Sequence, residues 1–294
     1  MENNLVTTEN FLTKAFGEEG LVGISDEVKE LYVSLANTIA GVNEGFEEVD
    51  TEWRPAIIRV VQAMSSTASG KPESAKIGDL YYKGGLIKRP FHAAVVYGWP
   101  TRVRFTNEDK VPSCSSENVD SKGKGALDKS ISIYGDACAK CPFDDQPFRH
   151  GKPTPCNDVM NVLLVPEDLS NIFVMPFSKT AYSAGRQIVT LASAKRPPWS
   201  RFFSIDTTVE KRKGGGGQFA IPNISAIDEK ELAVPDHLQK FCGMLSEHFK
   251  TFRQNNRARV LERASMVNDK VDMDTLDVPR GGKTSKEQDF SDEM

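Results

Sequence analysis

Between residues 53 and 227, apolar residues come in short runs rather than long periodic stretches, and this limits the fold more than any other feature of the chain. The runs are rich in β-branched and aromatic residues, with Gly, Pro or Asn between them. They are AIIRVVQAM, GDLYYKGG, HAAVVYGW, TRVRFTN, NVLLVPE, NIFVMPF, WSRFFSIDTTVE and GQFAIPNISAI. Such runs are typical of strands of about 5–7 residues. They argue against βαβ units, which need many crossover helices.

One segment with helical periodicity, SKTAYSAGRQIVTLASAK, interrupts the strands. We expect Ser178 to cap this helix, and Ala181, Ala184, Ile188 and Leu191 to share one face. The two strands after it are joined by KRKGGGG, which predicts a flexible, basic hairpin tip. Strands, a helix and a strand hairpin occur in this order in a small barrel of the OB kind, where the helix lies between the third and fourth strands.

Two further helices are predicted, one on each side of the barrel segment. The first is ISDEVKELYVSLANTIAGV, with Ser25 as its cap. Its apolar face is predicted to hold Val28, Leu31, Leu35 and Ile39. The second begins at Asp236, and its apolar face is predicted to hold Leu238, Phe241, Cys242, Leu245, Phe249 and Phe252. The expected fold class is mainly β with flanking helices (α+β): an OB-like barrel with an inserted loop, plus N- and C-terminal helices.

Charge is unevenly distributed over these parts. Residues 1–52, an acidic helical appendage, hold twelve acidic and two basic side chains, and the last eight residues hold four acidic and no basic ones. The stretch 53–286 therefore has 35 basic and 25 acidic residues, a net charge of +10. A positive body is the usual footprint of a polyanion partner; the alternative is ordinary charge segregation. We place the core at 53–235, the last helix at 236–267, and a disordered linker with an acidic tail at 268–294.

The compartment follows from what the sequence lacks. No run approaches the roughly 18 apolar residues of a membrane helix, and the N-terminus has no basic region followed by an apolar one. We expect a cytoplasmic protein without a membrane partner. Its cysteines number five, and a disulfide framework is unusual in a reducing compartment, so metal binding is the better explanation for clustered cysteines.

Four cysteines have a spacing that suits a structural zinc site. Cys138 and Cys141 form a C-x2-C pair, and Cys114 and Cys156 flank it, which gives C-x23-C-x2-C-x14-C. A C-x2-C turn supplies two ligands of a tetrahedral site, and other segments supply the rest. The segment that holds these cysteines, at about 112–158, is too polar to be stabilised by burial of its own side chains, and a bound metal would stabilise it. We therefore expect a zinc-binding loop inserted in the barrel. His150 is the reserve ligand if Cys114 is not one.

Two alternatives remain for these cysteines. A thioredoxin-like pair needs a helix after it, and CPFDDQPF has Pro, Asp and Pro there. Unligated thiols are the other alternative.

Basic and aromatic residues alternate along the predicted strands, as they do in proteins that hold single strands by phosphate contact and base stacking. The candidates are Tyr81, Tyr82, Lys83, Lys88, Arg89, Trp99, Arg102, Arg104, Lys195, Arg196, Trp199, Arg201, Lys211, Arg212 and Lys213. Arg102 and Arg104 share a strand face because side chains alternate along a strand. Trp99, Trp199 and Tyr82 are the best stacking candidates. For any one residue the simpler interpretation is a core aromatic or a solvated charge.

These features together resemble the zinc-containing single-stranded-DNA-binding proteins of tailed bacteriophages. The resemblance rests on IGDLYYKGG, SCSSEN, GDACAKCPFDDQPF and TPCNDV, and it covers roughly 53–225 plus the tail. It implies that zinc held by the four cysteines is structural. It also implies that an acidic tip recruits replication and recombination proteins and competes with DNA. The tip residues would be Asp289, Phe290, Asp292 and Glu293. The acidic N-terminus departs from the family's basic arm, and Phe290 is not terminal.

We therefore predict a non-catalytic protein that coats single-stranded DNA during replication, recombination and repair in a phage-infected host cytoplasm. The alternative is a zinc-stabilised phage adaptor that acts by protein contacts, such as a recombination directionality factor or an RNA-polymerase cofactor. An enzyme is the least favoured class. The four histidines lie in no recognisable motif, and KRKGGGGQF lacks the order of a phosphate-binding P-loop.

Overall fold

The computed structural model describes residues 12–13, 15–17, 23–40, 55–63, 71–83, 85–104, 114–116, 118–119, 125–126, 156–194, 197–211 and 217–268. At 40, 104, 114–126, 252 and 254–268 the description is limited to the backbone. The α-helices are α2 (Asp26–Ala40), α3 (Tyr182–Ser193) and α4 (Asp236–Asn268), and two 3-10 helices are η3 (Lys179–Ala181) and η4 (Pro198–Ser200). No helix in the described part of the chain combines the length and apolar character needed to cross a membrane.

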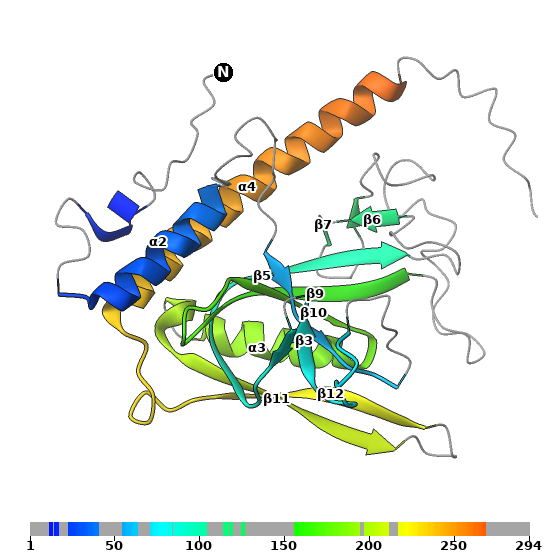
Figure 1. The fold of residues 1–294 in the computed structure, drawn as a ribbon. Helices are drawn as coiled ribbons and strands as arrows, with labels where there is room; N and C mark the ends of the chain where they lie inside the picture. The colour runs from blue at the N-terminus through cyan, green and yellow to red at the C-terminus, as the bar shows by residue number, and fades with distance from the viewer. Residues whose placement is uncertain are drawn as a thin grey trace, which may run out of the picture.

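The main sheet has the strand order β1-β10-β9-β5-β11-β12, and it curls into a half-barrel (Figure 1). Its strands are β1 (Ala56–Ile57), β5 (Phe91–Arg104), β9 (Cys156–Pro166), β10 (Phe173–Ser178), β11 (Phe202–Lys211) and β12 (Gln218–Ala226). Short β6 (Cys114–Ser116) also pairs with β5. Two small sheets consist of β2 (Arg59–Val60), β3 (Leu80–Tyr82) and β4 (Gly85–Ile87), and of β7 (Asn118–Val119) and β8 (Gly125–Ala126). The expected mainly β fold with flanking helices is confirmed at this level.

Strand β5 joins two runs that the sequence suggested were separate. It continues through Gly98 and Pro100 because β9 pairs with it across both residues. On its other side, residues 91–94 pair with β11 and residues 102–104 pair with β6. A bulge lies between Val95 and Tyr97, which pair with adjacent residues of β9. Since a bulge places two residues of one strand opposite one of its partner, every later side chain of β5 changes face.

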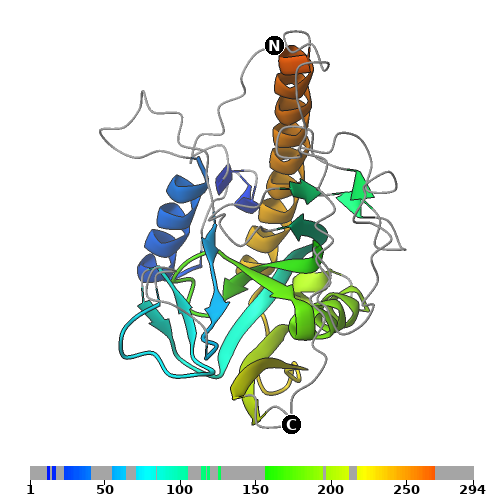
Figure 2. The same cartoon turned by 90° about the vertical axis from the view of Figure 1, so that its right-hand side faces the viewer.

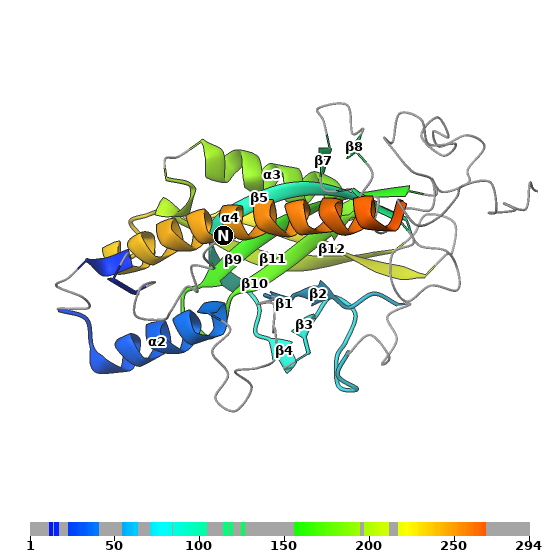
Figure 3. The same cartoon turned by 90° about the horizontal axis from the view of Figure 1, so that it is seen from above.

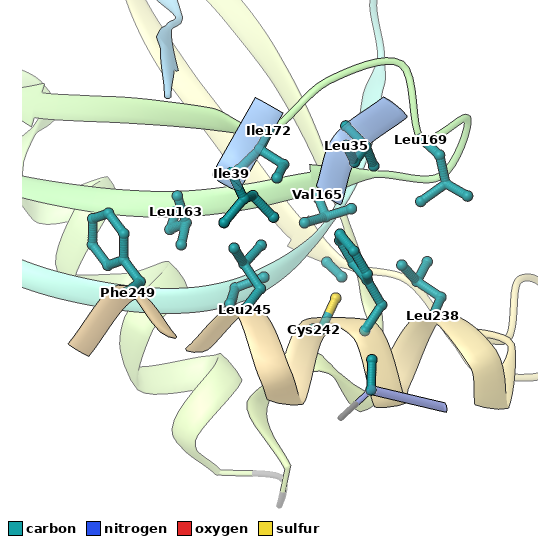
Figure 4. Close-up of a cluster of buried hydrophobic side chains, with 14 of the residues drawn as sticks. Leu35, Ile39, Leu163, Val165, Leu169, Ile172, Leu238, Cys242, Leu245 and Phe249 are labelled. Atoms are coloured by element: carbon teal, nitrogen blue, oxygen red, sulfur yellow. The ribbon is translucent and has the colours of Figure 1, made fainter. Parts of the chain in front are cut away.

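Strand β5 contributes side chains to both hydrophobic cores, which lie on opposite faces of the sheet. The inner core fills the half-barrel and contains Phe91, Ala93 and Val95. The outer core contains Ala94, Val96 and Trp99, and helices α2 and α4 cover it. Figure 4 shows side chains of α4 pointing from the helix toward the strands, among them Leu245 and Phe249.

Helix α3 lies against the inner core, between β10 and β11 in the chain. Ile188 and Ala192 are buried on it, and Ala181, Ala184 and Leu191 pack beside the same core, so the predicted face is confirmed. The expected cap is wrong, because the turn η3 comes first: Ser178 precedes η3 without a side-chain capping bond, and Ala181 precedes α3.

Helices α2 and α4 pack in one core with the sheet (Figures 1, 2 and 3). On α4 the described members of the predicted face are buried, including Cys242, and burial raises the pKa of its thiol well above the ordinary value. On α2 the predicted face is shifted. Leu35 and Ile39 are buried, but Leu31 is 36% exposed and the centre of the interface is Tyr32, which is fully buried.

Tyr32 connects α2 to the start of α4. Its hydroxyl lies 2.7 Å from Nδ1 of His237, and its ring packs on Phe241 at 5.0 Å between centroids. Burial lowers the pKa of His237, and the nearby Asp236 carboxylate opposes this effect. The described part of the acidic N-terminal segment is therefore packed into the body of the molecule.

Candidate nucleic-acid and metal site

Two of the four candidate zinc ligands occupy one row of the sheet. Arg104 of β5 pairs with Cys114 of β6 on one side and with Cys156 of β9 on the other. Directly paired residues lie opposite one another across a sheet, so the two cysteine positions share one row of the backbone. With strands roughly 4.8 Å apart, their Cα atoms are about 10 Å apart. Two thiolates on one tetrahedral zinc are about 3.8 Å apart when the Zn–S bonds are about 2.3 Å, so a shared site would need β6 and β9 to approach each other more closely at this end of the sheet.

The rest of the predicted metal site lies outside the described residues. This applies to Cys138, Cys141 and the reserve ligand His150. Cys156 is half-buried, while only the backbone is described at Cys114. In the described part of the chain, no three or more His, Cys, Asp or Glu side chains gather as metal ligands. Of the four candidate cysteines, the structure places Cys114 at the start of β6 and Cys156 at the start of β9.

Arg102 lies two residues before Arg104 on β5. Beside it lies an acidic residue, Asp158, which the sequence did not single out as part of the site. The Nε atom of Arg102 donates to Asp158 at 2.7 Å, and Asp158 is its direct partner on β9. The shared face of Arg102 and Arg104 is confirmed at the backbone level by their partners Asp158 and Cys156. Asp158 follows Cys156 by two residues, and residues two apart on a strand share a face. This spacing was the sequence signal that could have placed Asp158 beside the candidate site.

The two tryptophans among the stacking candidates pack against α4. Trp99 is 9% exposed, its ring lies 5.0 Å from that of Phe249, and the guanidinium of Arg253 lies 4.9 Å above it. Trp199 of η4 is half-buried against Gly243 of α4. While α4 stays in place, Trp99 does not reach the surface, where stacking on a base would require it.

The small sheet holds the tyrosine candidates. Tyr81 is 2% exposed, so it belongs to the core and not to the surface. Tyr82 is half-buried and meets Phe173 edge to face at 5.2 Å. Lys83 and Lys88, which flank β4, are exposed and remain available to a polyanion.

Arg89 is engaged by carboxylates. Its guanidinium contacts Asp79 at 3.2 Å and Asp206 at 3.1 Å, and it also donates to the Thr207 hydroxyl at 2.6 Å. One arginine between two aspartates leaves a net negative group, which repels a phosphate. The predicted phosphate contact at Arg89 therefore does not fit its surroundings.

The remaining candidates divide between the η4 region and the chain ends of the hairpin. Arg201 is half-buried, and its backbone forms an isolated antiparallel β-bridge with Ala233. Lys211, the last residue of β11, is exposed. Outside the described residues lie Lys195, Arg196, Arg212, Lys213 and the tail residues Asp289, Phe290, Asp292 and Glu293.

The open ends of two strand pairs point to one side of the molecule. In Figures 1 and 3 the end of β5 and start of β9 lie on the same side as the end of β11 and start of β12. The segment with the cysteines and the basic hairpin link therefore begin and end on that side. Comparison with protein-family models, with curated proteins and with solved structures finds no match to this chain.

Proposed function

We propose that this protein binds single-stranded DNA without sequence preference, on a barrel of the OB kind, as a non-catalytic factor in phage DNA replication, recombination and repair. The observation that carries the proposal is the strand connectivity. Strands β5, β9 and β10 form a meander, α3 follows, and β11–β12 form a hairpin whose first strand returns to pair with β5.

This order is that of an OB barrel, a five-stranded and partly open barrel that binds oligonucleotides with its first and last hairpin loops. Here those loops are residues 105–155, which hold the cysteines Cys138 and Cys141, and 212–217, which hold Arg212 and Lys213. The position between β10 and β12 is taken by residues 55–63: Ile58 donates to Val174, and the Gln62 side chain bonds to Ala220.

Structural zinc is part of the proposal. Its support is that Cys114 and Cys156 lie in one row at the end of the sheet. Cys138 and Cys141 would complete four thiolate ligands, provided that β6 and β9 approach each other at that end. Bound zinc would fix the fold of a long polar loop that has little to bury. The acidic tip at 287–294 would recruit partner proteins and compete with DNA for the basic surface.

The experiment titrates labelled oligo-dT and labelled duplex DNA with the full-length chain at 50 mM and at 200 mM salt. Binding is measured by the fluorescence polarisation of the DNA. We expect preference for the single strand and a steep loss of affinity at high salt, because each neutralised phosphate releases counterions. A matched pair of variants locates the surface. Lys211→Ala should weaken binding, and Lys230→Ala, which also removes one exposed cation but lies elsewhere, should not.

Absence of a complex with oligo-dT at 50 mM salt would overturn the proposal. In that case, retained capture of replication or recombination proteins by the tail would favour the adaptor function. Equal affinity for duplex and single strand would overturn the single-strand preference.

A further inference from the structure

The β11–β12 hairpin extends beyond the body of the sheet as an arm, which we define as residues 208–211 and 217–219. Strand β11 pairs with β5 only as far as Ile205. Past that point β12 is its only strand partner among the described elements. Every residue of the arm is exposed except Phe219, which is half-buried, and Val209 is 42% exposed. Little apolar burial holds the arm in place.

Polar contacts at the base of the arm supply what burial does not. Arg89 joins Asp206 and Thr207, the two residues before the arm, to Asp79 in the turn that precedes β3. The Thr207 hydroxyl also donates to the carbonyl oxygen of Gly78 at 2.6 Å. The arm is thus tied to a turn more than a hundred residues away in the sequence.

The turn at Gly78 is shaped to approach the arm closely. Gly78 has a φ of +95°, which favours glycine, and a Cβ atom there would lie 3.0 Å from Thr207 Oγ1 and from Val209 Cγ2. Hydrogen bonds between Val61 and the pair Gly78 and Asp79 hold the turn against the segment beside β12. The turn at Gly78 therefore packs closely against the arm on one side and is hydrogen-bonded to Val61 on the other.

A second tie reaches the other strand of the hairpin. The side-chain amide of Gln62 donates to the carbonyl oxygen of Ala220 at 2.8 Å and accepts from its N–H at 2.9 Å. It satisfies both groups of that residue as a neighbouring strand would. We name Gln62, Gly78, Asp79, Arg89, Asp206 and Thr207 the brace.

We propose that the brace is a positioning device for the basic tip of the arm, with Arg89 as its central positioning residue, and that the brace itself does not contact DNA. The inference rests on the proposed function. The charge of the brace supports this role. One Arg and two Asp give the brace a net charge of −1, whereas the end of the arm carries the cations Lys211, Arg212 and Lys213. An arm that is already fixed in position loses less conformational entropy when its cations bind phosphates than a mobile hairpin would.

The test uses the full-length chain and the slope of log affinity for oligo-dT against log salt. Arg89→Ala removes one charge, and a direct phosphate contact would change the slope by about 0.7. We expect a change of about 2, close to that caused by the arm-tip variant (Lys211, Arg212 and Lys213 to Ala). Combining the two variants should weaken binding no further than the arm-tip variant alone.

Asp206→Asn gives the sharpest result, because the two interpretations predict opposite signs. If Arg89 contacted phosphate, removal of an adjacent negative charge would tighten binding. If the brace positions the arm, the same change should weaken binding several-fold, although it makes the protein less acidic. Exposed Asp228→Asn is the matched control and should leave affinity within about twofold.

The outcomes separate this inference from the proposed function. A wild-type chain that does not bind oligo-dT overturns both. A weakened arm-tip variant together with tighter binding by Asp206→Asn, or additive effects of Arg89→Ala, overturns the positioning role alone. An arm-tip variant that binds like the wild type also overturns it, and then the DNA surface lies elsewhere.

Discussion

Replacement of Gly185 by Ala tests how α3 sits on the inner core. A Cβ atom at this position would lie 2.6 Å from Phe177 Cβ, 2.8 Å from its Cγ and 2.9 Å from Met160 Cβ. These atoms are the stems of two buried side chains and cannot swing away. Inserting a group into such a site costs about 1–3 kcal/mol, and we take about 3 because three contacts are violated together. The helix gains roughly 1 kcal/mol when Gly becomes Ala, so the expected net loss is about 2 kcal/mol.

The assay is urea unfolding monitored by tryptophan fluorescence. A loss of about 2 kcal/mol lowers the midpoint by about 1 M if m is near 2 kcal/mol per M. Gly243→Ala on α4 is the matched control. Its Cβ atom would lie 3.3 Å from the far ring edge of half-buried Trp199, which has room to shift, so we expect a change between zero and about 1 kcal/mol of stabilisation. If Gly185→Ala unfolded at the same urea concentration as Gly243→Ala, the seating of α3 derived above would be refuted.

Three further predictions concern the outer core and the metal. Phe249→Ala should cost about 3–5 kcal/mol in urea unfolding, because the residue is only 3% exposed; a loss under about 1 kcal/mol would contradict its burial. The pKa of His237 is lowered on folding, so stability should fall as pH drops below about 6.5. His237→Gln should flatten that slope between pH 7.5 and 5.5, and an unchanged slope would count against the assignment. Zinc per folded chain should fall in Cys156→Ser but not in Cys242→Ser, and equal content in both would remove Cys156 from the ligands.

Much of the fold is predictable because periodicity and turn residues act locally. The face of α4, the helix between two groups of strands and the hairpin after it all follow from the spacing of apolar residues. Strand β5 was predicted as two strands because Gly98 and Pro100 are local signals for a break. Pairing with β9 on one side and with β11 and then β6 on the other overrides that signal. Strand partners distant in sequence leave no such trace.

The candidate site was predictable in residue type but not in partner. Alternating cations and aromatics are typical of a nucleic-acid surface, yet the same residue types stabilise a protein's own interior. Trp99 and Arg253 meet across β5 and α4, and Arg89 meets Asp206 across 117 residues. Sequence spacing does not distinguish an arginine that awaits a phosphate from one already paired with carboxylates. The row of Cys114 and Cys156 likewise depends on strand register, which a spacing of 41 intervening residues does not encode.

The bulge at Val95 and Tyr97 makes β5 sensitive to the parity of insertions and deletions. Loss of one residue there would turn each later side chain of the strand to the opposite face. Trp99 would then point into the half-barrel, and Arg102 would point under α4. A change of two residues would keep the faces and only shift the levels. We therefore expect homologues of this chain to vary in length at this point by even numbers of residues, and to vary freely in the loop that follows β5.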